Sequence, residues 1–197
     1  MIYIQKAAYQ FAKIKFLYSI IKNNRGFISG GVFKDLFLDK KPRDIDVFFR
    51  NEFDFYMASN NNINLESMEL IYENENAIGY HNKILGLNID FVRKSFGSPQ
   101  EIMNEFDFTV TQFSLFEEDG VFKVLYQSDY FEDLMNKRLK WNKDFDNPVS
   151  LVQRCMRYSG YGFKPVKKDF IDLLYELNQL EDDEFKRLSL MNYYQYY

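Results

Sequence analysis

The feature that most constrains this chain is the stretch "ISGGVFKDLFLDKKPRDIDVFF" at residues 28–49. It places a glycine pair before a short apolar helix, and the strand that follows carries Asp44 and Asp46. Alternation along a strand sends these two carboxylates to one face, while Ile45 and Val47 enter the core. The stretch therefore predicts a compact strand–turn–helix–strand unit with negative charge on one face of its second strand.

The carboxylates point to a divalent cation. Two of them about 6–7 Å apart along a strand repel each other unless a cation lies between them. Mg²⁺ prefers a few carboxylates together with substrate phosphates. The segment "LNIDFVR" offers a third carboxylate, Asp90, between apolar neighbours that face away from it. We therefore predict a Mg²⁺ site formed by Asp44, Asp46 and Asp90.

The glycine pair, Gly30-Gly31, fits an anion. Glycines before a helix let backbone N–H groups approach a phosphate, and the helix N-terminus adds a favourable field. Neither a Gly-Gly pair nor a DxD triplet is specific alone. A second triplet at residues 144–146 precedes "NP", and we interpret it as a solvated surface turn. The two features at this spacing, with a helix between them, indicate a triphosphate and metal site.

Composition narrows the function classes. The chain has 197 residues, 46% hydrophobic and 19% aromatic, which is enough apolar material for a core. A net charge of −4 argues against a broadly basic nucleic-acid surface but leaves room for a local patch. Cys155 is the only cysteine, and the only histidine, His81, is interpreted as a turn residue. We expect a cytoplasmic protein with no signal peptide and no transmembrane segment.

Secondary-structure patterns change along the chain. Apolar residues at helical spacing predict a helix within residues 6–24. "SPQE" at residues 98–101 is a capping box that predicts a helix, and Asp119-Gly120 predicts a hairpin. We expect an α/β head over residues 1–126 and a helical neck over 127–197. Within the head we expect strands at 27–29, 43–49, 67–73, 76–81 and 84–93, a helix at 32–38, and a helix and loop over 52–66.

These residues resemble a known family. "GGVFKDLFLDKKPRDIDVFF" is similar to the head signature of class II nucleotidyltransferases, the bacterial poly(A) polymerases and CCA-adding tRNA nucleotidyltransferases of the polymerase β superfamily. "FDFTVTQFSL" resembles the motif RRDFTxNAL, and "RCMRYSGYGF" is similar to the family's neck. The resemblance covers roughly residues 26–165. It implies an α+β fold with a small mixed sheet flanked by helices, followed by a short helical neck.

The resemblance also implies roles for individual residues. Asp44 and Asp46 would bind two Mg²⁺ ions, with Asp90 as the third carboxylate. The triphosphate would contact Gly30 and Gly31. The other positions that the resemblance implies are Ser29 at the triphosphate, Lys34 in place of an arginine, Asp107 at the ribose 2′-hydroxyl, and Arg154 and Arg157 at the triphosphate or base.

Several of these positions also have a structural interpretation. Lys34 could be a solvated helix residue. Asp107 could cap a helix that begins at "DFTV". Arg154 and Arg157, three residues apart on one helix face, could pair with acidic neighbours.

Two departures separate this chain from the family pattern. Glu105 and Phe106 replace the arginines of the RRD motif. The base-reading EDxxR motif would fall on Asn147, Pro148 and Leu151, and none of the three matches it. The resemblance is therefore to a reduced member of the family, and we do not expect an ordered C-C-A addition.

We predict a Mg²⁺-dependent nucleotidyltransferase that moves an NMP from an NTP to an acceptor hydroxyl, most simply a tRNA-like RNA 3′ end. Two alternatives stay open. The acceptor could be a protein side chain or small molecule, or the chain could be a non-catalytic nucleotide-binding module. We expect no membrane partner, and the sequence leaves the oligomeric state open.

Overall fold

The computed structural model describes residues 1–7, 9–22, 24–61, 67–141 and 147–191. The chain divides into two compact units. The first unit comprises Met1–Phe106 and Thr111–Tyr130, and the second comprises Asp107–Val110 and Phe131–Tyr197. Residues 107–110 thus belong with the second unit, although they precede the expected boundary at residue 126. The DxD triplet at 144–146 lies outside the described residues.

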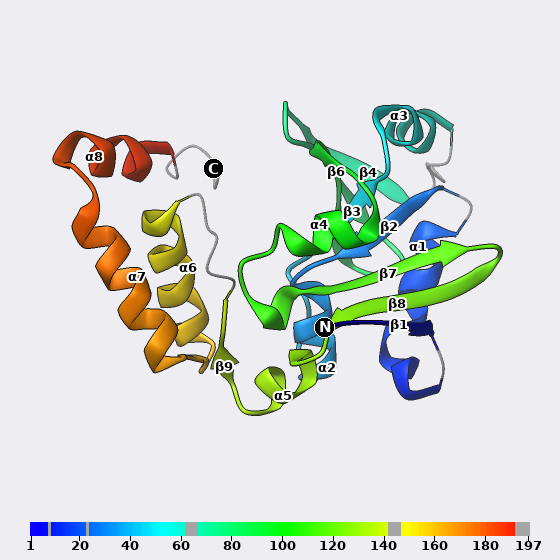
Figure 1. Ribbon diagram of the computed structural model, residues 1–197. Coiled ribbons are helices and arrows are strands. Elements are labelled where there is room, and N and C mark those ends of the chain that lie inside the picture. The colour runs from blue at the N-terminus through cyan, green and yellow to red at the C-terminus, as the bar shows by residue number, and fades with distance from the viewer. Residues whose placement is uncertain (8, 23, 62–66, 142–146, 192–197) are drawn as a thin grey trace. The chain divides into compact units, whose positions relative to one another are not determined.

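The first unit is built on one eight-stranded sheet in the order β1-β8-β7-β2-β3-β6-β5-β4 (Figure 1). Only β3 and β6 pair in parallel; every other neighbouring pair in this order is antiparallel. The strands are β1 (Ile2–Lys6), β2 (Gly26–Ser29), β3 (Asp44–Phe49), β4 (Met68–Glu73), β5 (Ala77–Asn82), β6 (Leu87–Phe96), β7 (Phe113–Glu118) and β8 (Val121–Gln127).

Helices accompany this sheet, so the predicted α+β class with a mixed sheet is confirmed. They are η1 (Tyr9–Leu17, a 3-10 helix), α1 (Tyr18–Ile21), α2 (Val32–Phe37), α3 (Glu52–Asn61) and α4 (Pro99–Asn104). The capping box is present as predicted: the Ser98 side chain accepts from the N–H of Glu101, and the Glu101 carboxylate accepts from the N–H of Ser98. The hairpin at Asp119-Gly120 joins β7 and β8 as expected.

The single N-terminal helix expected within residues 6–24 is wrong. Residues 2–6 form strand β1 against β8, and a 3-10 helix follows before the short helix α1. The buried side chains of Phe11, Ile14 and Leu17 are spaced three apart. That spacing fits the three residues per turn of a 3-10 helix, so this tighter helix keeps all three on the core side.

The two faces of β3 differ in the way that alternation predicts. Ile45 and Val47 are fully buried on one face. On the other face, Phe48 joins an apolar cluster with Ile102 and Met103 of α4. The same face carries Asp44 and Asp46 at the start of the strand. Polar and apolar residues thus share one face of β3, with the carboxylates at one end and the apolar cluster at the other.

The second unit is mainly helical. Its elements are η2 (Thr109–Thr111, whose last residue belongs to the first unit), α5 (Tyr130–Met135, whose first residue does), β9 (Arg138–Leu139), α6 (Pro148–Gly160), β10 (Lys164–Pro165), α7 (Lys167–Gln179) and α8 (Asp182–Met191). No helix in the described ranges is long and apolar enough to cross a membrane.

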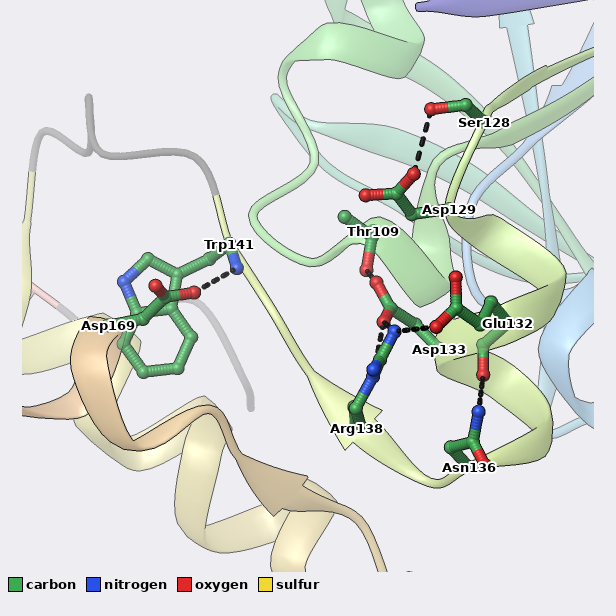
Figure 2. Close-up of polar contacts among 9 residues, drawn as sticks. All are labelled: Thr109, Ser128, Asp129, Glu132, Asp133, Asn136, Arg138, Trp141 and Asp169. Carbon is green, nitrogen blue, oxygen red and sulfur yellow. Dashed lines mark hydrogen bonds and ion pairs between the residues drawn. The ribbon is translucent and has the colours of Figure 1, made fainter.

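A buried carboxylate ties the parts of this second unit together (Figure 2). Asp133 is fully buried and accepts from the Thr109 hydroxyl at 2.6 Å and from Nε of Arg138 at 2.8 Å. The Arg138 guanidinium also reaches Glu132 at 2.8 Å. Residues 107–110 are therefore fixed to the segment after α5 by a fully paired ionic group.

Candidate active site

Strand pairing brings the three predicted carboxylates together. The parallel register sets Asp46 of β3 opposite Asp90 of β6, and Asp44 opposite Asn88. Paired residues on neighbouring strands lie on the same face, with about 4.8 Å between the strands. Asp44, Asp46 and Asp90 are thus neighbours on one face of the sheet. This group is called the carboxylate row below.

The carboxylate row holds negative charge close together. The pKa of Asp46 is raised to about 7, first by burial and then by the nearby charges of Asp44 and Asp90. The positive charges of Arg43 and Lys94 oppose this shift. Burial also raises the pKa of Asp90, against the lowering effect of a hydrogen bond from Tyr72. Like charges that raise the pKa of a neighbouring carboxyl mark a place where a cation would be favoured.

Two members of the carboxylate row have partners within the chain. Nε of Arg43 lies 2.7 Å from a carboxylate oxygen of Asp44, and Tyr72 hydrogen-bonds Asp90. Over the part of the chain that the structure describes, no three His, Cys, Asp or Glu side chains are already arranged as ligands of one metal ion. The donor set still fits Mg²⁺ chemically, because it consists of clustered carboxylate oxygens. Arg43 contacts one oxygen of Asp44 and its side chain is 75% exposed, so other lone pairs of this carboxylate stay available to a metal.

The glycine turn lies at the same end of β3 as the carboxylate row. The antiparallel register pairs Ile28 with Val47, so the turn after β2 approaches the start of β3. Gly30 has a φ of 101°, a conformation that glycine adopts readily, and its N–H donates to the carbonyl of Phe113 at 3.0 Å. Gly30 therefore contributes its conformation, whereas Gly31 is the N-cap of α2, at the end of the helix where backbone N–H groups lack acceptors within the helix.

Two other predicted positions near this turn are buried. Ser29 is fully buried, and its hydroxyl shares a hydrogen bond of 2.6 Å with Ser114. Lys34 is 4% exposed and pairs with Asp35, so its interpretation as a solvated helix residue is wrong. Both side chains are therefore engaged within the fold.

Phe106, which replaces an arginine of the family's RRD motif, packs near the glycine turn. A methyl group added to Gly30 would meet the Phe106 ring at 2.8 Å, and the same ring packs edge-on against Phe48 at 6.0 Å. An apolar ring thus lies against the glycine turn at the position where the family motif has an arginine.

The remaining predicted residues lie in the second unit. Arg154 on α6 forms an ion pair of 2.8 Å and a second contact of 3.3 Å with the Asp107 carboxylate. Burial raises the pKa of Asp107, while Arg154 and, more weakly, Arg157 lower it. The structure brings Asp107 and Arg154 together. This agrees with the interpretation that Arg154 pairs with an acidic neighbour. Asp107 precedes a 3-10 helix rather than the α-helix that its capping interpretation requires.

The positions that align with the base-reading motif serve the start of α6. The Asn147 side chain caps this helix by accepting from the N–H of Ser150 at 3.0 Å. Pro148 is buried at the first helical position, and Leu151 is fully buried. These side chains are thus committed to local structure.

Sequence reasoning missed two neighbours of the carboxylate row. His81 lies within strand β5, so its interpretation as a turn residue is wrong; its Nδ1 is 2.9 Å from the side-chain oxygen of Asn88, the residue paired with Asp44. Tyr72 reaches Asp90 from β4, two strands away from β6. Neither link has a local sequence signal, because both depend on strand register.

Comparison with known proteins agrees with this architecture. A sequence model described as "Gabija anti-defense 2 family protein" matches residues 3–137. This chain belongs to the Gabija anti-defense 2 family. A protein of Bacillus phage SPbetaL7 named "Gabija anti-defense 2" is 24% identical over an alignment of 193 residues, and this alignment covers 92% of this chain and 46% of that protein. The chain therefore spans about half the length of this curated member of the Gabija anti-defense 2 family.

Solved structures give the fold. A CCA-adding enzyme in complex with ATP matches with a TM-score of 0.65 and 16% identity, over 94% of this chain and 50% of that one. The Thermotoga maritima CCA-adding enzyme complexed with tRNA matches with a TM-score of 0.62 and 14% identity, over 94% and 49%. This member of the Gabija anti-defense 2 family thus has the nucleotidyltransferase head fold of CCA-adding enzymes, as predicted.

Proposed function

We propose that this chain is a Mg²⁺-dependent nucleotidyltransferase that transfers a nucleoside monophosphate from an NTP to an acceptor hydroxyl and releases pyrophosphate. The observation that carries the proposal is the carboxylate row beside the glycine turn. Asp46 and Asp90 are register partners on neighbouring strands, and burial with like charge raises the pKa of Asp46 to about 7. Carboxylates so close together disfavour their own ionised form, and a bound cation would offset this cost. The reaction that we propose requires such a cation.

Each part of the site has a separate task in this proposal. Asp44, Asp46 and Asp90 hold two Mg²⁺ ions, and bound Mg²⁺ would increase the acidity of the acceptor hydroxyl and neutralise charge on the pyrophosphate. Backbone N–H groups of the first turn of α2, beginning at Gly31, bind the triphosphate. Gly30 sets the conformation of the turn, with Ser29 and Lys34 supporting it from within the fold.

Three residues of the second unit have roles in nucleotide binding that we propose one by one from the family resemblance. Asp107 is proposed to accept a hydrogen bond from the ribose 2′-hydroxyl. Its carboxylate is held by Arg154, which fixes the direction of its oxygens. Arg157, on the same helix, is proposed to bind the triphosphate or base. Asn147, Pro148 and Leu151 are occupied in starting α6, so selection of an ordered C-C-A sequence is not part of the proposal.

The acceptor that we propose first is an RNA 3′ end, since solved structures with this fold include a CCA-adding enzyme complexed with tRNA. A second candidate is favoured by the name of the phage relative, Gabija anti-defense 2. A protein that counters a defence would modify a component of that defence, so a hydroxyl-bearing protein side chain of the Gabija system is the second acceptor.

The test uses the full chain, Mg²⁺ and each α-labelled NTP in turn, first with cellular RNA and then with proteins of the Gabija system. We expect Mg²⁺-dependent label on one acceptor class, and none with the variant Asp46→Asn. Label on RNA supports the first acceptor, and label on protein supports the second. Saturable NTP binding without label on either would favour a non-catalytic nucleotide-binding module.

A further inference from the structure

Tyr72 has a contact with the carboxylate row that the proposed function does not use. Strand register pairs Tyr72 of β4 with Gly79 of β5, and Gly79 with Asp90 of β6. The three residues therefore form one line across three strands, on the face that carries the carboxylates. The Tyr72 side chain crosses β5 and hydrogen-bonds Asp90.

Gly79 is what lets the tyrosine cross the strand. A methyl group at Gly79 would overlap the Tyr72 ring, with ring carbons Cδ1 and Cζ only 2.5 and 2.6 Å away. Atoms in a packed structure do not approach so closely, so any side chain at this position would displace the ring. The glycine thus leaves open the place that the Tyr72 ring occupies.

A β-bulge in β4 directs the Tyr72 side chain over Gly79. Leu70 pairs with Tyr80 and Tyr72 pairs with Gly79, so Ile71 is the extra residue of a β-bulge. Without the bulge, Ile71 would stand opposite Gly79 and the tyrosine would turn to the other face. Bulges often re-aim a side chain next to an active site.

We propose that Tyr72 is a positioning residue for the third carboxylate, Asp90. This inference rests on the proposed function, because it concerns the same metal-binding row. The tyrosine hydroxyl donates to Asp90, and an ionised carboxylate has about four lone-pair positions. One hydrogen bond therefore fixes the side chain while it leaves oxygen lone pairs for Mg²⁺. Without it, repulsion from Asp46 favours a conformation of Asp90 directed away from the row.

The exposure of Tyr72 supports this role. Its side chain is 38% exposed, whereas the neighbouring Tyr80 is 7% exposed and packs edge-on against Phe91 at 5.4 Å. A half-exposed tyrosine adds less to the core than a buried one, so its ordered crossing of β5 is better explained by the contact with Asp90. Tyr80 faces the other side of the same sheet and is a matched control for loss of a tyrosine hydroxyl.

The test measures Mg²⁺ binding to the full chain by calorimetry. Loss of a hydrogen bond to a metal-ligating group typically weakens metal binding about tenfold to a hundredfold. We expect Tyr72→Phe to weaken Mg²⁺ binding about tenfold, and Gly79→Ala to do the same by displacing the ring. The double variant should be no weaker than either single variant, and Tyr80→Phe should bind Mg²⁺ as the wild type does. Wild-type Mg²⁺ affinity in Tyr72→Phe would overturn the inference.

Failure of the proposed function gives a different pattern. If the wild type shows no saturable Mg²⁺ binding that Asp46→Asn removes, the metal site itself is wrong. A metal-free double-mutant cycle with Tyr72→Phe and Asp90→Asn then examines the contact through thermal unfolding. If the hydrogen bond from Tyr72 holds Asp90, the effects of the two substitutions on stability should be non-additive. Additive changes would overturn the inference whether or not Mg²⁺ binds, and non-additive changes without Mg²⁺ binding would reduce Tyr72 to a structural role.

Discussion

Two carboxylates, one in each unit, meet opposite surroundings. Asp133 in the second unit is fully buried, but Arg138 supplies a guanidinium at 2.8 Å and Thr109 a hydroxyl at 2.6 Å. Asp46 in the first unit has two other carboxylates as neighbours, and burial with their charge raises its pKa to about 7. One charge is balanced within the chain; the other is made less favourable by its neighbours.

The difference separates a structural group from a candidate functional one. A buried carboxylate that is fully paired holds its segment in place, and removing a partner destabilises the fold. A carboxylate among like charges reduces the stability of the metal-free chain and gains a favourable setting only with a bound cation. Substitution of Asp133 should therefore lower the stability of the metal-free protein, whereas substitution of Asp46 should keep or raise it.

Asp46→Asn should give the largest effect, on activity. Removing one metal-binding carboxylate should reduce nucleotide transfer by about a thousandfold or more, since metal ions contribute several kcal/mol to stabilising the transition state. The metal-free protein should keep its stability or gain some, because repulsion from Asp44 and Asp90 is relieved. Transfer assays and thermal unfolding without Mg²⁺ measure the two effects.

Asp44→Asn is expected to act in the same direction on transfer, with a smaller gain in metal-free stability because Arg43 already pairs with Asp44. Wild-type turnover in either variant would sink the two-metal assignment.

Asp133→Ala should give the next largest effect, on stability. Arg138 and Thr109 would both lose a hydrogen-bond partner, and hydrogen bonds to charged groups contribute about 1.5–3 kcal/mol each. We expect a loss of about 3 kcal/mol in the free energy of unfolding, with Mg²⁺ affinity unchanged in the folded protein. Denaturant unfolding measures the loss, and Asp133→Asn, which keeps an acceptor, is the control with the smaller change. A variant as stable as the wild type would contradict the structural assignment.

The contrast also shows what a sequence can predict. Local signals were read correctly at the carboxylate strand, the capping box at Ser98 and the hairpin at Asp119-Gly120, where each signal lies within a few residues. The fold class was predicted from the family resemblance that residues 28–49 carry.

Contacts between residues far apart in the sequence could not be predicted from local patterns. Thr109 and Asp133 are 24 residues apart, and no spacing rule links them. Tyr72 meets Asp90 only because β4 carries a bulge that shifts its register, and a one-residue shift moves a side chain to the opposite face. At the N-terminus, pairing of β1 with β8 and a three-residue spacing of buried side chains replaced the expected helix.

The metal-free protein should lose stability as pH rises from about 4 to 7. The folded-state pKa of Asp46, about 7, lies above its ordinary value of 3.8, so the folded state binds a proton that the unfolded state has released. The shift alone would convert to about 4 kcal/mol, and we expect about 2 kcal/mol because Asp46 is half-buried and solvent screens it. Denaturant unfolding across this pH range measures the slope, which Asp46→Asn should flatten. Asp133→Asn is the matched comparison and should leave the slope in place.

The smallest effect is expected at Arg43, whose guanidinium pairs with Asp44 of the carboxylate row. Its Nε lies 2.7 Å from Asp44, but its side chain is 75% exposed, and exposed ion pairs contribute only about 0.2–1 kcal/mol. The positive charge of Arg43 repels a cation at the neighbouring carboxylates, so Arg43→Gln should strengthen Mg²⁺ binding about twofold to fivefold. Arg43→Lys keeps the charge and should bind Mg²⁺ nearly as the wild type does. Calorimetry at low salt, where screening is weakest, gives the largest signal. Weaker Mg²⁺ binding in Arg43→Gln would mean that the arginine holds Asp44 in place for the metal, as Asp133 is held by Arg138, and the contrast between the two carboxylates would narrow.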